Sequence, residues 1–227
     1  YKHQRVFSSI DRYGRYAYNS QPGIGVWNLM RLAETLLPLL AENADDAVKI
    51  ATTHLETYKA QYEAAWLAGM RAKCGLTAGG DADGQDKALI DALFDVMDDN
   101  EADFTLTFFQ LSRLGAASPV GDAVIRGLFA EPAALEGWLA QWRARLARET
   151  QSDAARQAGM QAVNPVVIPR NHQIEAAIRA AEDRGDFSVF HALHAVLQNP
   201  YSEQAGNEQY RLPPTPEEAV TKTFCGT

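Results

Sequence analysis

The sequence predicts a mainly α protein. Apolar residues recur three or four positions apart almost everywhere along the 227 residues, and alternation with a period of two is nearly absent. Clusters of Gly and Pro separate the apolar segments, as is typical of loops between helices. Hydrophobic residues make up 46% of the chain, which is enough to bury a full core. We therefore expect ordered helices over most of the length.

The first expected elements are a loop and two long helices. Residues 1–23 form the loop, and a helix follows over residues 24–41, with Pro38 ending or kinking its last turn. The next helix begins at Asp45, where acidic residues meet the positive end of the helix dipole. One apolar stripe continues to Lys73, so we expect a single helix of roughly 40 Å.

A stretch rich in Gly and Asp, residues 75–84, interrupts the helical pattern. Its Asp81-Ala82-Asp83-Gly84 run invites comparison with a calcium loop. The glycine is misplaced, however, and the twelfth position would be Ala92 rather than Glu. We therefore reject calcium binding and expect a solvated linker.

The remaining helices are bounded by familiar start and stop signals. Pro132 suits a first helical turn, and Ser152 suits an N-cap. An extended apolar connector is expected at 163–169, and Pro residues after 212 favour an extended tail. The expected helices cover residues 89–97, 104–111, 132–146, 152–163, 171–184 and 187–198, and a further segment begins at Ser118 and runs through Phe129.

Composition excludes several classes of function. The formal charge of −8 and the pI near 5.1 argue against a nucleic-acid surface, because phosphate contacts need clustered Lys and Arg. No run approaches the 18 or so apolar residues of a membrane span. Two cysteines cannot form a disulfide framework, so a reducing compartment is expected.

Some side chains invite a functional interpretation that we set aside. His191 and His194 lie one helical turn apart, but a third ligand at a fixed distance is missing, so we expect no metal site in this chain. The Trp138 and Trp142 pair is interpreted as core. A solvated helix face, balanced by nearby acids, is expected for the arginines of the same helix, Arg143, Arg145 and Arg148.

The segment Gly14–Pro22 is an unusual loop, because it carries two tyrosines and an arginine and runs directly into a strongly apolar helix. On that helix Asn28, Arg31 and Thr35 share one face. A buried donor without a partner costs about 1–3 kcal/mol, so we expect Asn28 and Arg31 to contact loop groups outside the helix. Plain core packing around Trp27 is the alternative.

These residues carry a resemblance to a known family. The string Gly-Arg-Tyr-x-Tyr-x-x-Gln-Pro-x-x-x-x-Trp-Asn-Leu-x-Arg-Leu-Ala, found from Gly14 to Ala33, resembles the selenoprotein O family (SelO, including the bacterial YdiU proteins). Cys225, near the C-terminus, stands where some members carry selenocysteine. A second stretch supports the resemblance: Asn164-Pro165, Arg170-Asn171, Ala177-Ile178, Ala181-Glu182, Gly185-Asp186 and Asn199-Pro200-Tyr201.

The resemblance implies a fold and an activity. Family members are kinase-like enzymes that use ATP with Mg²⁺ or Mn²⁺ to transfer AMP to Ser, Thr or Tyr of other proteins. Residues 1–23 would then be the end of an activation segment, residues 24–200 the helical lobe with its C-terminal extension, and residues 201–227 an extended tail. Asn28 and Arg31 would support the catalytic loop.

The resemblance also implies that the chemistry lies elsewhere. The nucleotide-binding, metal-binding and catalytic residues of the family precede the Gly-Arg-Tyr block, and no phosphate loop or Asp-Phe-Gly-like triplet is found here. The chain begins with Tyr1, so we expect the C-terminal half of a longer enzyme, inactive and free of metal and nucleotide by itself. Its partners would be the missing N-terminal half, ATP and protein substrates. The expected location is the bacterial cytoplasm, or the mitochondrion in a eukaryote.

Two other functions stay open. The chain could be a non-catalytic, all-helical interaction or regulatory module that uses its Tyr-rich N-terminal arm as a contact surface. A kinase-like phosphotransferase is the third reading.

The two cysteines are expected to differ. Cys74, at the end of an apolar helix, is interpreted as structural, whereas Cys225 lies on a polar, Pro-rich tail and is a candidate redox thiol. In some family members the terminal cysteine pairs with one just before the Gly-Arg-Tyr block. The corresponding segment here, Val6–Asp11, has no cysteine, so we expect no such disulfide.

Overall fold

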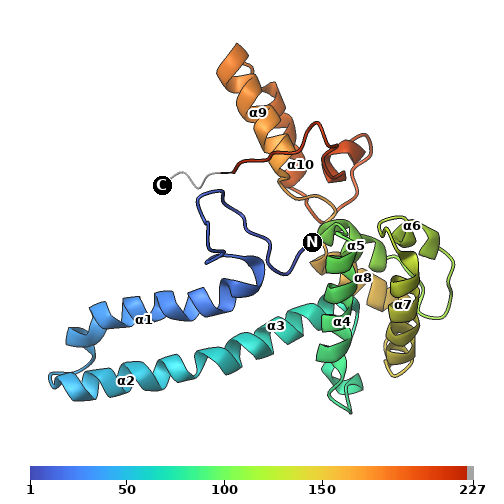
Figure 1. The fold of residues 1–227 in the computed structure, drawn as a ribbon. Coiled ribbons are helices and arrows are strands. Elements are labelled where there is room, and N and C mark those ends of the chain that lie inside the picture. Colours follow the sequence, from blue (N-terminus) through green and yellow to red (C-terminus); the bar gives the residue numbers. More distant parts are fainter. Residues whose placement is uncertain (224–227) are drawn as a thin grey trace. The chain divides into compact units, whose positions relative to one another are not determined.

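The regular elements of the described chain are all helical (Figure 1). The structure is a computed structural model, and it describes residues 1–223. The mainly α class is therefore confirmed. The α-helices are α1 (Gln21–Leu40), α2 (Ala44–Glu56), α3 (Tyr58–Cys74), α4 (Asp86–Asp99), α5 (Phe104–Leu111), α6 (Asp122–Arg126), α7 (Pro132–Leu146), α8 (Asp153–Val163), α9 (Asn171–Arg184) and α10 (Ser188–Leu197).

The chain forms two compact units. The first, which we call the hairpin unit, contains Lys2–Gly69 together with Thr223. The second, the core unit, contains Tyr1 and Met70–Lys222. The boundary between the units falls inside α3. The functional division expected from the sequence, at residues 23 and 200, remains a prediction.

In the hairpin unit, α1 runs antiparallel to α2 (Figure 1). The side chain of Asn43 caps α2, because its oxygen accepts hydrogen bonds from the backbone N–H groups of Asp45 and Asp46 at 2.9 and 3.1 Å. The expectation of one helix from Asp45 to Lys73 is wrong, since α2 and α3 are separated at Thr57. The Thr57 hydroxyl donates to the carbonyl of His54 at 2.7 Å, and such local bonds compete with the helical ladder.

The core unit is built around α4, α5 and α7. Trp138 and Trp142 of α7 stack with their rings 6.0 Å apart and are 2% and 0% exposed, which confirms their assignment to the core. Their indole N–H groups donate to the carbonyls of Leu89 and Cys74 at 2.8 and 2.9 Å. Other large, fully buried side chains are Ile90, Leu93, Met97, Phe108, Leu111, Ile125, Leu135, Leu139 and Met160.

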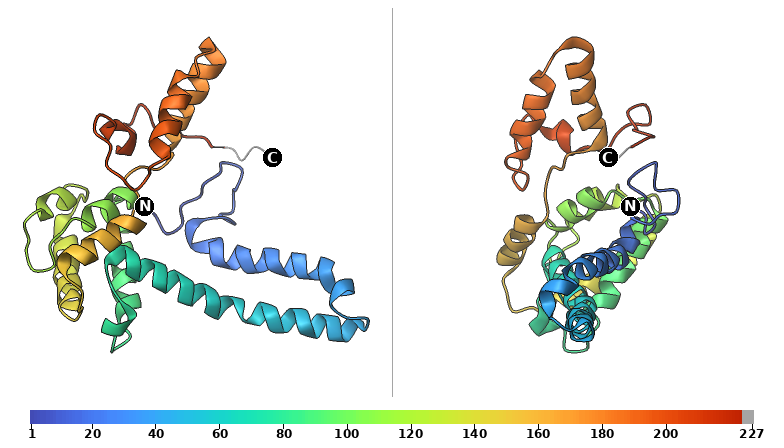
Figure 2. Two further views of the ribbon diagram at one scale, coloured as in Figure 1. Left: turned by 180° about the vertical axis from the view of Figure 1, so that it is seen from behind. Right: turned by 90° about the vertical axis from the view of Figure 1, so that its left-hand side faces the viewer.

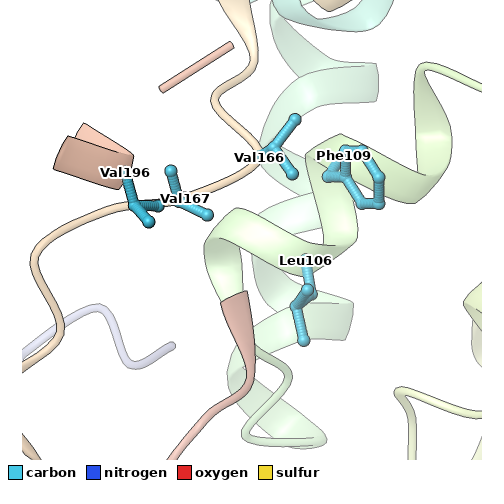
Figure 3. Packing of buried hydrophobic residues seen from close by; sticks show 5 residues of the cluster. All are labelled: Leu106, Phe109, Val166, Val167 and Val196. Atoms are coloured by element: carbon cyan, nitrogen blue, oxygen red, sulfur yellow. The ribbon is translucent and has the colours of Figure 1, made fainter. Parts of the chain in front are cut away.

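The apolar connector after α8, which includes Val166 and Val167, packs against the end of the last helical pair of the core unit. Helices α9 and α10 form a helical pair (Figure 2). The backbone N–H groups of Val166 and Val167 both donate to the carbonyl of Pro200, at 2.7 and 3.2 Å. Their side chains join a buried cluster, which Figure 3 shows with residues from α5 and α10: Leu106, Phe109, Val166, Val167 and Val196.

Two of the three arginines expected on a solvated helix face are instead bound by carboxylates of other segments of the core unit. Arg145 is 4% exposed, and its Nε donates to the carboxylate of the fully buried Asp86 at 2.6 Å. Arg71 donates to the other oxygen of Asp86 at 2.7 Å. Glu149 accepts from Arg145 at 2.7 Å and from the Thr77 N–H at 2.9 Å. We call these five residues the Asp86 network.

Arg143 makes a second such contact, with the first residue of α6. It binds Asp122 through both terminal nitrogens, at 2.9 and 2.7 Å, and also donates to the carbonyls of Gly115 and Ser118. The solvated-face prediction is therefore wrong for Arg143 and Arg145. Arg148 alone fits it, because its ion pair with Asp83 is half-exposed.

The linker over residues 75–84 is consequently less solvated than expected. Asp81 binds the Arg71 side chain and accepts from the backbone N–H of Asp86 at 3.1 Å. Burial raises the pKa of Asp81, but its bonds to Asp86 and Arg71 outweigh burial and leave that pKa below its ordinary value.

The helices within residues 1–223 are all too short or too polar to cross a bilayer.

Candidate functional site

The N-terminal loop of the hairpin unit is organised by its own backbone. Both carboxylate oxygens of Asp11 accept backbone hydrogen bonds, from the N–H groups of Arg15 and Tyr16 at 2.9 and 2.8 Å. Further along, the N–H of Tyr18 donates to the carbonyl of Arg5 at 3.0 Å. The Tyr-rich block therefore enters α1 from a folded loop.

Two arginines contact the indole of Trp27 at the start of α1. The guanidinium of Arg15 lies 4.2 Å from the ring centroid, and that of Arg31 lies 5.5 Å from it. Arg31 also forms an ion pair with Glu34, one turn along the helix, at 2.7 Å. The charge of Arg31 is thus balanced within α1.

Asn28 and Arg31 are both exposed. The Arg31 side chain is 49% exposed, and neither residue forms a hydrogen bond or ion pair with a loop among residues 1–223. The loop contacts expected from the sequence are therefore not found in the described chain. Support of a catalytic loop by these residues remains a prediction.

Helix α1 is strongly apolar, yet none of its residues is buried in the structure of residues 1–223. Trp27 is 43% exposed and Leu39 is 81% exposed. The other exposed large apolar residues of α1 are Leu29, Met30, Leu32 and Leu36. An apolar surface of this extent is typical of an interface rather than of a solvent-facing helix.

One side of α1 approaches α3 closely at Gly25. A Cβ atom at this position would lie 2.5 Å from the hydroxyl oxygen of Tyr58.

Burial, with a contribution from Tyr62, raises the pKa of Tyr18, and burial also raises the pKa of Tyr62. Both phenols are therefore neutral at physiological pH, so neither is an available base.

Nothing in the described chain assembles a metal centre. No group of three or more His, Cys, Asp or Glu side chains lies close enough to hold an ion among residues 1–223. His191 and His194 are exposed on α10, beside the ring of Phe190.

The structure describes only one of the two thiols. Cys74 is fully buried, and burial raises the pKa of its thiol to about 12, so it is protonated and inert at neutral pH. Cys225 lies outside the described residues. The last described residue, Thr223, bonds to the N-terminal loop: its hydroxyl donates to the carbonyl of Phe7 at 2.8 Å, and its carbonyl accepts from the N–H of Ser9 at 2.7 Å.

Thiol labelling of the native chain should therefore distinguish the two cysteines. We expect a maleimide reagent to modify Cys225 first and Cys74 only after unfolding, because Cys74 is buried and its thiolate is disfavoured. Mass spectrometry of digests, with a Cys225→Ser variant as control, measures both rates. Rapid labelling of Cys74 in folded protein would contradict its structural role.

Comparison with known proteins places these features in a wider context. A family model described as "Protein adenylyltransferase SelO" matches residues 1–198. The "Protein nucleotidyltransferase YdiU" of Rhizobium leguminosarum bv. trifolii is 52% identical over 222 residues, which cover 98% of this chain and 44% of that relative. The YdiU proteins of Bradyrhizobium sp. (strain ORS 278) and Rhodopseudomonas palustris (strain BisB18) are 50% and 51% identical, and each match covers 100% of this chain and 45% of the relative. The chain spans less than half the length of these curated relatives.

Proposed function

The chain belongs to the SelO family of protein adenylyltransferases, and from this premise we propose that it is the C-terminal part of such an enzyme. The full-length protein, meaning this chain joined to the part of its relatives that it does not cover, transfers AMP from ATP to Ser, Thr or Tyr hydroxyls of other proteins. The hairpin unit supports the catalytic loop, and the core unit forms the helical lobe and its extension.

The observation that carries this proposal is the unburied apolar surface of α1. Burying apolar surface stabilises a protein by roughly 25 cal/mol per Å², so an exposed helix of this composition gains much from a partner surface. Leu29 and Leu39 mark the two ends of the part of that surface that a partner would bury. The remainder of the full-length protein covers it and thereby places Asn28 and Arg31 against its catalytic loop.

The metal and the nucleotide belong to the other part of the full-length protein. ATP with Mg²⁺ or Mn²⁺ needs carboxylate or amide ligands and cationic phosphate contacts. The described residues offer no acidic cluster of that kind. We therefore assign no step of AMP transfer to a residue of this chain, which contributes position and support.

ATP labelled at two positions tests the proposal. With the α-phosphate labelled, the full-length protein should transfer label to protein, whereas label at the γ-phosphate should stay in pyrophosphate. The chain alone should neither bind ATP–Mg²⁺ in calorimetry nor transfer label. Transfer of the γ-phosphate would instead establish a phosphotransferase, and micromolar ATP binding by the chain alone would place the nucleotide site within it.

The same apolar helix favours one alternative. If the α1 surface docks a separate protein rather than the rest of its own polypeptide, the chain is a non-catalytic interaction module. Joining the chain to the missing part would then leave α1 exposed. Hydrogen exchange of residues 24–40 decides between the two, because adenylyltransferase assembly protects α1 only in the full-length protein.

A further inference from the structure

A shallow pocket of about 510 Å³ opens beside the start of α1 in the hairpin unit. One loop residue, a short 3₁₀ turn over residues 18–20 and the first turns of α1 supply its walls. The lining residues are Arg15, Asn19, Ser20, Gly23, Ile24 and Trp27, none of them acidic. In a chain with a formal charge of −8, a pocket with a cation and no carboxylate is a local exception.

The cation of this pocket is held in place but not neutralised. The Arg15 guanidinium stacks on Trp27 at 4.2 Å and lies 5.6 Å from the ring of Tyr16. No carboxylate among residues 1–223 forms an ion pair with it. Asp11, the acid of the same loop, is engaged by the backbone N–H groups of Arg15 and Tyr16 instead.

Two neutral donors complete the pocket. The side chains of Asn19 and Ser20 form no hydrogen bond with another residue of the described chain, and Ser20 does not cap α1. The pocket therefore gathers a guanidinium, an amide and a hydroxyl, all available for an external acceptor. Trp27 and Ile24 add apolar walls that suit the methylene groups of a side chain.

We infer that this pocket binds a carboxylate of Asp or Glu in the protein substrate, so that acidic segments are preferred; the inference rests on the proposed function. A single guanidinium with two neutral donors matches the single charge of a carboxylate. Arg31, the other cation at Trp27, is already paired with Glu34. The pocket stands at the loop that leads into α1.

Peptide binding to the full-length protein tests the inference without ATP. Two fluorescein-labelled ten-residue peptides would each carry one Ser in a Gly-rich sequence, flanked by either Glu or Gln. In fluorescence anisotropy at about 0.15 M salt, where the Debye length is roughly 8 Å, we expect at least tenfold tighter binding of the Glu peptide. Long-range attraction by this chain does not favour the Glu peptide, because the chain is itself acidic.

Matched variants locate the binding. Arg15→Gln should reduce affinity for the Glu peptide at least tenfold, and Ser20→Ala should reduce it two- to fivefold. Arg12→Gln removes the same charge from an exposed residue of the same loop that does not line the pocket, and should change affinity less than twofold. Circular dichroism melting of each variant confirms that it is folded.

Equal affinity for the two peptides would overturn the inference, as would equal losses for Arg12→Gln and Arg15→Gln. Glu-peptide binding by the 227-residue chain that disappears in the full-length protein would also overturn it, because a carboxylate of the protein itself then fills the pocket. Transfer of label from ATP is measured separately on wild-type protein. If transfer fails while the binding pattern holds, the proposed function falls and the carboxylate pocket stands.

Discussion

Replacing Asp86 with Ala should destabilise the core unit by about 3–5 kcal/mol, the cost of removing one partner from a buried ion pair. Asp86 is fully buried and accepts from Arg71 and Arg145 at 2.7 and 2.6 Å. Its removal leaves the Arg145 guanidinium, which is 4% exposed, without its central acceptor. Urea unfolding followed by tryptophan fluorescence measures the loss.

Asp91→Ala is the matched control for this prediction. Asp91 lies on the same helix, but its ion pair with Lys87 is half-exposed, and such pairs contribute about 0–1 kcal/mol. We expect the two variants to differ several-fold in their effect on the free energy of unfolding. Comparable small losses would mean that Arg145 finds full compensation from Glu149 and Thr77.

The largest effect on function is expected from Arg31→Met in the full-length protein. If Arg31 supports the catalytic loop, its loss misplaces reacting groups, and a displacement of about 1 Å can cost roughly 100-fold in rate. We expect kcat for AMP transfer to fall by about that factor, while KM for ATP and the melting temperature stay unchanged. Steady-state kinetics with labelled ATP measures the split.

Two control variants separate this role from local electrostatics. Lys59→Met removes an exposed charge with a long ion pair of 3.9 Å elsewhere in the hairpin unit, and should leave kcat within twofold. Glu34→Gln breaks the ion pair that Arg31 makes within α1. A loss with Glu34→Gln as large as with Arg31→Met would show that the pair, rather than loop support, matters.

Periodicity was sufficient to predict a core-unit helix such as α7, because that helix buries an apolar face. It placed Trp138 and Trp142 in the core, where the structure has them. It could not reveal the break at Thr57, since a hydroxyl that bonds to a nearby carbonyl leaves the apolar pattern unchanged. Local chemistry therefore decided what hydrophobic spacing left undetermined.

The sequence could not show which polar side chains pair with one another when they lie far apart in the chain. The arginines of α7 look like an ordinary charged face, because the partner of Arg145 is 59 residues earlier in the chain. Asp86 itself looks like a routine acidic residue in a first helical turn. Only packing reveals that these two side chains meet in the core.

The candidate site was predicted in part. The Tyr-rich block was recognisable as a folded loop, but the stacking of Arg15 on Trp27 depends on a backbone path that spacing does not specify. The spacing of Asn28 and Arg31 predicts that they share one helix face, but not that both are exposed. Their expected loop partners are not among residues 1–223, and an apolar helix sequence does not reveal which surface covers it.

The bonds of Thr223 to Phe7 and Ser9 make the core unit an insertion within the hairpin unit. During translation the N-terminal loop leaves the ribosome long before the residue that pairs with it, which lies 214 positions after Ser9. At about 5–20 residues per second, this delay is roughly 10 to 40 s. The core unit is therefore synthesised in full before the N-terminal loop can form its hydrogen bonds with Thr223.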